Sequence, residues 1–254
     1  MLNADSLESS LYLDLLKRCL TRMIFPDGCV NRNLVAEDTY DAAIRQVGRD
    51  WPTEAETMIG FERLAHLERC VTQAVRDGVP GDLVETGVWR GGASILMRAV
   101  LKVYGDLQRK VWLFDSFEGL PVANPDQYPA DRHDRLSSLS AYLGVSLEKV
   151  QANFARYGLL DEQVRFVKGW FKDTVPGAPV DKIAVLRLDG DMYESTIQVL
   201  EGLYSKVSPG GFVVVDDYVL GNCRAAVQDF RNKYGIAEEI QRIDWTGVFW
   251  QRNR

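Results

Sequence analysis

From residue 82 to the C-terminus, short β-branched and apolar runs alternate with segments of helical periodicity. Such apolar runs occupy 83–86, 111–115, 164–167, 183–189 and 212–216. Helical segments cover 91–103, 194–206 and 222–234. Strands that alternate with helices along a chain form a parallel sheet with helices on both faces. This pattern therefore predicts an α/β fold.

The end of the chain refines this prediction. Two more strands, 239–244 and 247–252, are separated only by a tight turn at 245–247. They should pair as a hairpin, which makes one strand antiparallel. Five βα units that end in such a hairpin resemble class I methyltransferases, which have a Rossmann-like, seven-stranded, mostly parallel sheet with an antiparallel last strand.

The first third of the chain is predicted to be helical. Apolar residues recur at three- and four-residue spacing, which indicates one helical stripe: Leu7, Leu11, Leu15, Leu16, Cys19, Leu20 and Ile24. Further helices are expected at 38–48 and 57–76, and no linker-like composition follows them. We therefore expect 1–80 to be a helical cap within the same domain as a core at 81–254. The stripe fits packing on the chain's own domain or on a second copy, so a homo-oligomer stays open.

Charge and composition exclude several classes of protein. The net charge is −6 and the positive residues are scattered, which argues against a nucleic-acid partner. Four widely spaced cysteines and two histidines fit neither a zinc site nor a disulfide framework, and they indicate free thiols in a reducing cytoplasm. The N-terminus is polar and acidic, and no apolar run approaches the ~20 residues of a membrane span. We expect a cytoplasmic protein with no membrane partner.

Ligands of open α/β sheets bind outside the carboxyl ends of the strands. The first strand ends in Glu85-Thr86-Gly87-Val88-Trp89-Arg90-Gly91-Gly92-Ala93-Ser94 and leads into a helix. Glycines allow close approach of the backbone, and a helix N-terminus offers N–H donors to a carboxylate such as that of S-adenosylmethionine (SAM). The spacing matches neither a GxGxxG motif nor a P-loop. A tight turn without a ligand is the alternative.

Acidic residues follow three further strands. Asp115 ends the second strand, where it could form a turn or accept the ribose hydroxyls of a nucleoside, and the glycine turn beside it favours ribose. Asp189 and Asp191 follow the fourth strand, and Asp216 and Asp217 end the fifth. Gathering these carboxylates costs several kcal/mol unless cations or protons neutralise them. All-oxygen ligands suit a hard ion such as Mg²⁺, with a solvated acidic cluster as the alternative.

Longer motifs resemble those of the macrocin O-methyltransferase family, the sugar O-methyltransferases of macrolide and aminocoumarin antibiotics. They are 85–92, 115–119, 169–174, 188–193, 208–211 and 216–218, together with Thr57-Met58-Ile59-Gly60 in the cap. They stand in the family's order and span nearly the whole chain. Two parts depart from the family pattern, namely 124–145 and the residues Met192, Glu194 and Ser195. Both fall near the expected acceptor, so the identity of the acceptor is not predicted.

The resemblance implies a role for each motif. It assigns Mg²⁺ to Asp189, Asp216 and Asp217, and the general base to Asp191. It places SAM against Met58, Ile59, Glu85, Thr86, Gly87, Val88, Arg90, Gly91, Ser94, Asp115, Ser116, Phe117, Gly169, Trp170 and Phe171. Within this set the glycine turn would hold the methionine part, Asp115 the ribose, and Trp170 with Phe171 the adenine. The resulting hypothesis is a metal-dependent SAM O-methyltransferase that acts on a sugar hydroxyl of a glycosylated natural product.

Weaker candidates remain for the acceptor site. Tyr128, Tyr142 and Tyr193 are better placed for it than the strand tyrosines, and His133 lies in a polar loop where it could contact the acceptor or simply be solvated. His66 lies within a helix beside leucines and is interpreted as structural.

Three other functions fit parts of this pattern. Asp189-Gly190-Asp191 alone fits the Asp-x-Asp motif of a metal-dependent glycosyltransferase, but that reading leaves the glycine turn and the other acids unexplained. A non-catalytic SAM-binding protein would be expected to lack the acidic site. A phenolic acceptor of the catechol type is the closest competitor, because the same metal arrangement suits adjacent hydroxyls.

Overall fold

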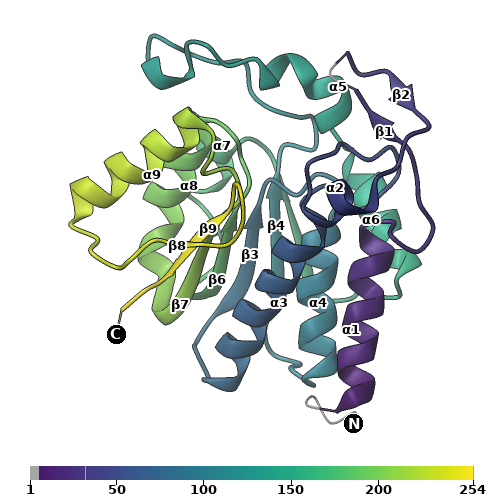
Figure 1. Ribbon diagram of the computed structural model, residues 1–254. Coiled ribbons are helices and arrows are strands. Elements are labelled where there is room, and N and C mark those ends of the chain that lie inside the picture. The colour runs from purple at the N-terminus through teal and green to yellow at the C-terminus, as the bar shows by residue number, and fades with distance from the viewer. Residues whose placement is uncertain (1–5, 32, 254) are drawn as a thin grey trace.

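The computed structural model describes residues 6–31 and 33–253. Its centre is a seven-stranded sheet in the order β5-β4-β3-β6-β7-β9-β8 (Figure 1). The strands are β3 (Asp82–Thr86), β4 (Val111–Asp115), β5 (Val164–Lys168), β6 (Ile183–Leu188), β7 (Val207–Val215), β8 (Gln241–Arg242) and β9 (Val248–Gln251). Strand β9 is antiparallel to both of its neighbours, and the pairs among the first five are parallel. The predicted class I methyltransferase sheet is confirmed.

Helices cover both faces of this sheet. One face is covered by α1 (Leu7–Leu20), α3 (Gly60–Arg76), α4 (Gly92–Val103) and α6 (Leu147–Arg156), and the other by α8 (Tyr193–Leu203) and α9 (Gly221–Tyr234). Successive strand residues point to opposite faces, so Leu83 belongs to the first core cluster and Val84 to the second. All six residues of β6 are buried, as a central parallel strand requires.

The N-terminal helices share the core of the sheet. Leu16 and Leu20 of α1 and Leu67 of α3 lie in the same buried cluster as residues of β3 and α4. These N-terminal helices therefore pack directly on the layer of helices that covers the sheet, and the division into a cap at 1–80 and a core at 81–254 of one domain stays a prediction. The predicted apolar stripe on α1 is only partly buried: Leu16 and Leu20 are buried, whereas Leu11 and Leu15 are exposed.

Several elements differ from the expectation. The helix expected at 38–48 is reduced to α2 (Ala42–Gln46), and α3 begins at Gly60, not at residue 57. Helix α6 was not predicted. The remaining short elements are β1 (Cys29–Val30), β2 (Ala36–Glu37), η1 (Pro129–Asp131), η2 (Leu136–Leu139), α5 (Ser140–Leu143), α7 (Phe171–Thr174) and η3 (Tyr204–Lys206). All four cysteines are free thiols. Within 6–31 and 33–253, none of the helices has the length and apolar character needed to cross a membrane.

The segment 120–146, which we call the strap, passes over the carboxyl ends of the strands. In Figure 1 it is the teal segment at the top of the molecule, above β3 and β4. It contains η1, η2 and α5, and it links β4 to α6. The strap therefore covers the edge of the sheet at which the predicted functional residues lie.

Candidate active site

The direction of the strand order reverses between β3 and β6. From β3 the chain continues to β4 and β5 on one side, whereas β6 is followed by β7 on the other. A cavity of about 700 Å³ lies at the carboxyl ends of these strands, where ligands of such sheets bind. Its walls come from the cap, the glycine turn, the strap and the starts of α7, α8 and α9. The topology alone thus brings residues from distant motifs to one site.

The glycine turn after β3 is shaped by close backbone contact. Gly87 has a φ of +83°, and a Cβ at this position would overlap the carbonyl oxygen of Asp189. Only glycine therefore fits between the ends of β3 and β6. The N–H of Gly92 at the start of α4 donates to the carbonyl oxygen of Glu56 at 2.9 Å. One of the N–H groups at the start of α4 that were expected to face the cofactor is therefore bonded to the cap instead.

Glu85 and Asp115 are both held by hydrogen bonds. Glu85 is buried and accepts hydrogen bonds from Ser94 Oγ and from Arg187, the latter at 2.6 Å. Burial raises the pKa of Glu85 to about 7. Asp115 accepts the N–H of Val88 at 2.7 Å on Oδ2 and that of Phe117 at 2.6 Å on Oδ1. These bonds fix the Asp115 carboxylate at the cavity wall and leave lone pairs on both oxygens.

Three carboxylates converge where β6 and β7 end. Asp189, Asp216 and Asp217 each offer an oxygen, and the three oxygens lie within 4.8 Å of one another. Asp191 stands beside them with a left-handed backbone, φ +58°, and its N–H donates to Asp217 Oδ2 at 3.2 Å. In the described part of the chain, the Asp191 carboxylate itself accepts no hydrogen bond. The trio is therefore fit to bind a cation, while Asp191 stays free to exchange a proton.

Two buried arginines were missed by sequence reasoning. The Arg187 guanidinium contacts Asp189 Oδ2 at 2.8 Å and Asp216 Oδ1 at 2.6 Å, in addition to Glu85. Arg63 of α3 pairs with Asp216 through its other oxygen and approaches Asp244 at 3.1 Å. Arg187 could have been found from the sequence, because an arginine in the otherwise apolar β6 is expected to pair with buried acidic residues. No such signal marks Arg63.

Even with these arginines, the carboxylates remain crowded. Burial together with the charges of Asp189 and Asp216 raises the pKa of Asp191 to about 8. Burial and the charge of Asp191 raise the pKa of Asp217 well above its usual range, and burial also raises that of Asp189. In each case burial disfavours the ionised form, and the neighbouring acids add to that effect. Additional positive charge would therefore stabilise the ionised carboxylates of this cluster.

The cavity brings together most of the predicted site residues. It is lined by Met58, Ile59, Glu85, Gly87, Val88, Asp115, Ser116, Tyr128, Trp170, Phe171, Asp189, Asp191, Asp216 and Asp217. Other predicted residues do not line it: Thr86, Arg90, Gly91, Ser94, Phe117 and Gly169. The Arg90 guanidinium, for example, donates to the carbonyl oxygen of Ala55 at 2.9 Å and so fastens the cap.

Three of the weaker acceptor candidates are not brought to the cavity. His133 is exposed on the strap. The Tyr142 hydroxyl donates to the carbonyl oxygen of Pro52 at 2.8 Å, and the Tyr193 hydroxyl donates to Asp229 at 3.0 Å. Both tyrosines therefore hold other elements in place. Of the residues that depart from the family pattern, Met192 is fully buried, whereas Glu194 and Ser195 do line the cavity.

Comparison with known proteins agrees with this geometry. Residues 9–252 match the family model of macrocin-O-methyltransferase (TylF). A Streptomyces olivaceus 8-demethyl-8-(2,3-dimethoxy-alpha-L-rhamnosyl)-tetracenomycin-C 4'-O-methyltransferase is 56% identical over 95% of this chain and 92% of its own length. A Micromonospora griseorubida mycinamicin III 3''-O-methyltransferase is 50% identical over 96% of each chain.

A solved structure gives the same result. The O-methyltransferase NovP superposes with a TM-score of 0.92 at 51% identity, covering 97% of this chain and 100% of NovP. This agreement removes the glycosyltransferase and non-catalytic alternatives. With its class I sheet, glycine turn and strand-end acids, the chain belongs to the macrocin O-methyltransferase family and is a SAM-dependent O-methyltransferase.

Proposed function

We propose that this enzyme methylates a sugar hydroxyl of a glycosylated natural product with the help of a divalent metal ion, Mg²⁺ being the best candidate. One observation carries the proposal: three carboxylate oxygens within 4.8 Å of one another line the same cavity as the glycine turn. The names of the two relatives describe methyl transfer to a rhamnosyl tetracenomycin and to mycinamicin III. Those names support a sugar-bearing acceptor for this chain.

The cavity supports one orientation for SAM. The methionine part would lie along the turn at Gly87, and the ribose hydroxyls would donate to Asp115, whose oxygens are fixed by two backbone N–H groups. Trp170 would face the adenine from one side, and Met58 with Ile59 would close over it from the cap. An aromatic and apolar pocket with few polar groups suits an adenine ring.

The acidic trio fits a hard divalent ion. Its donors are all carboxylate oxygens, the ligands that Mg²⁺ prefers. Each Asp216 oxygen already accepts from one arginine and keeps a second lone pair for a metal bond. Arg63 and Arg187 would then hold the Asp216 carboxylate in position, and Asp216 would still bind the metal ion. In this role, Asp189, Asp216 and Asp217 hold the ion.

Asp191 would act as the general base. When bound, SAM would supply an electrophilic sulfonium methyl group, and the ion would supply polarisation that lowers the pKa of the acceptor hydroxyl. Asp191 would take the proton of that hydroxyl as the methyl group passes from sulfur to the acceptor oxygen. Its pKa is about 8 because of burial and the charges of Asp189 and Asp216. A cation on Asp189 and Asp216 would remove the part of this rise that comes from their charges, and so would favour the ionised form of Asp191 that a base needs.

Calorimetry tests this proposal directly. SAM is titrated into the metal-free protein, and rhamnosyl tetracenomycin and mycinamicin III are then titrated with and without Mg²⁺. We expect micromolar SAM binding in both conditions, and acceptor binding only with Mg²⁺. Methyl transfer that persists in EDTA would disprove the metal's role, and transfer to a catechol but to neither glycoside would replace the sugar acceptor with a phenol.

The four free cysteines also support our proposal that the enzyme works in a reducing, intracellular compartment. A thiol titration of freshly purified protein under denaturing conditions tests this, with four reactive thiols expected. Recovery of fewer thiols without added reductant would contradict it.

A further inference from the structure

The strap is fastened over the cavity by a buried aspartate that no motif indicated. Asp131, at the end of η1, has an exposed fraction of 0%. Its Oδ1 accepts the N–H of Tyr193 at 2.8 Å, and its Oδ2 accepts the N–H of Glu194 at 2.9 Å. Asn222 Nδ2 donates to Oδ1 at 3.0 Å. One carboxylate thus joins the strap to the first residues of both α8 and α9.

These contacts lie next to the reacting groups. Tyr193 and Glu194 follow Asp191 by two and three residues, and Asn222 is the second residue of α9, the helix that comes after Asp217. The first N–H groups of a helix lack partners within the helix, and Asp131 supplies them from another part of the chain. Its negative charge also suits the positive end of the α8 dipole. The position of the α8 N-terminus, and with it the loop that carries Asp191, therefore depends on Asp131.

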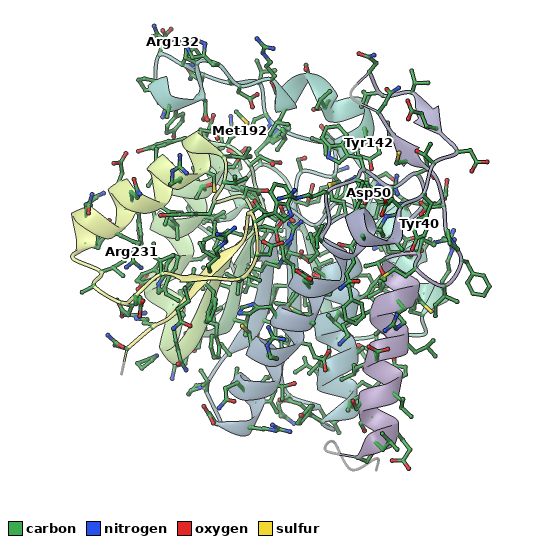
Figure 2. All side chains as sticks on the ribbon, in the orientation of Figure 1. Tyr40, Asp50, Arg132, Tyr142, Met192 and Arg231 are labelled. Atoms are coloured by element: carbon green, nitrogen blue, oxygen red, sulfur yellow. The ribbon has the colours of Figure 1, made fainter. Side chains whose placement is uncertain are left out.

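The same carboxylate also holds the part of the strap that lines the cavity. On the strap the cavity is lined by Leu120, Pro121, Val122, Asn124, Gln127, Tyr128, Leu136 and Leu143. Asp131 lies within this stretch and anchors it on one side of the cavity. On the other side the Tyr142 ring stacks on Trp51 of the cap at 5.4 Å, and Figure 2 shows Tyr142 at this junction with the cap, near Asp50. Between the two anchors the strap contributes Leu136 to the cavity wall, and just outside them it contributes Tyr128 and Leu143.

We propose that Asp131 is a positioning residue for methyl transfer, which holds the acceptor-facing strap and the Asp191 loop in one fixed geometry. The inference rests on the proposed function for its acceptor. It predicts that the two halves of the cavity respond differently to loss of Asp131. The proposed SAM half, with Gly87, Asp115 and Trp170, makes no contact with this carboxylate among the described hydrogen bonds, so SAM affinity should not depend on it.

The variant Asp131→Asn tests this with little change in volume. An amide offers one acceptor oxygen where the carboxylate offers two, so at least one of the two N–H groups at the start of α8 loses its partner. Asn222→Ala removes the third hydrogen bond to Asp131, together with the Asn222 Oδ1 that accepts the N–H of Cys223 at 3.0 Å. It leaves both bonds from Asp131 to α8 in place and is the milder variant should Asp131→Asn fold poorly. Asp41→Asn is the control for the loss of charge alone, because Asp41 accepts the N–H groups of Ala43 and Ile44 at the start of α2 on one oxygen, Oδ1, which an amide retains, and lies outside the cavity.

With mycinamicin III or rhamnosyl tetracenomycin as acceptor, we expect Asp131→Asn to lower kcat at least ten-fold and to raise the acceptor KM at least five-fold. The Kd for SAM should stay within two-fold, and Asp41→Asn should change neither kcat nor KM. Asn222→Ala should fall between wild type and Asp131→Asn. Unchanged kinetics in a folded Asp131→Asn protein would overturn the inference. So would a loss of SAM affinity that matches the loss of turnover.

Amide hydrogen exchange separates this inference from the proposed function. If the wild type methylates neither acceptor, the proposed function fails, but Asp131→Asn should still speed exchange at 120–146 and at the start of α8. Exchange in β3 and α4 should stay as in the wild type. Equal exchange of the strap in both proteins would show that Asp131 does not hold it.

Discussion

His66 gives the protein a predictable sensitivity to acid. The residue lies on α3 with an exposed fraction of 6%, and its ring packs against Phe249 with 4.3 Å between centroids. Burial and the neighbouring Arg69 lower the pKa of His66 from 6.5 to about 4. The unfolded chain therefore binds a proton between pH 6.5 and 4 that the folded protein excludes. Stability from this residue is complete above pH 6.5 and is lost as the pH falls toward 4.

The size of the effect follows from the shift. Between pH 7.5 and 5.0 the linkage relation gives a loss of about 2 kcal/mol from His66 alone. Urea unfolding of the wild type and of His66→Leu at both pH values isolates this contribution, because every other titrating group is shared. His133→Gln is the matched control, since His133 is exposed. We expect His133→Gln to follow the wild type and His66→Leu to lose about 2 kcal/mol less on acidification. Parallel losses in the wild type and His66→Leu would refute the reasoning.

Four further variants test the proposed roles in the cavity. Asp191→Asn should lower kcat by about 10²–10⁴-fold, as loss of a general base does, with SAM and Mg²⁺ affinities in calorimetry within two-fold of wild type. Asp217→Asn should weaken Mg²⁺ binding at least ten-fold yet raise the Tm of the metal-free protein, because it relieves the crowding that raises the pKa of Asp217; a lower Tm would contradict that account. Arg187→Met should cost about 3–5 kcal/mol in urea unfolding, since it leaves the buried Glu85 and the half-buried Asp189 without a cationic partner and Asp216 with Arg63 alone, and a loss below 1 kcal/mol would show that water reaches them. Trp170→Ala should raise the SAM Kd about ten-fold and leave the acceptor KM unchanged, whereas the reverse pattern would move the adenine elsewhere.

The sheet and its acidic edge were predictable because they rest on local patterns. Each of the five parallel strands is a short apolar run between turns, and buried strands of this kind are recognised without knowing their partners. Strand ends then locate Asp115, Asp189 and Asp216, because parallel strands expose their carboxyl ends at one edge. The convergence of the acids followed from fold class alone.

The strap was not predictable for the opposite physical reason. It contains only short 3-10 and α-helical turns, and its conformation depends on distant partners such as Pro52 for Tyr142 and Asn222 for Asp131. Nothing in the local sequence distinguishes Asp131, which is buried, from Asp134, which is not fully so. The same holds for Arg63, whose partner Asp216 lies 153 residues away. Tertiary pairing of polar groups leaves no periodic signal in the chain.

The two arginines that the sequence did not predict distinguish the carboxylates proposed to bind the cation from the one proposed to take the proton. Arg187 bridges Glu85, Asp189 and Asp216, and Arg63 holds the second oxygen of Asp216. These pairings fix the carboxylates of the trio while leaving them short of positive charge, so a divalent ion can bind without rearranging them. Asp191 contacts neither arginine among the described ion pairs, and only burial and nearby charge set its pKa. In the proposed function, the residues that would bind the cation are therefore those that the arginines hold or adjoin, and the residue that would take the proton is the one that no arginine contacts.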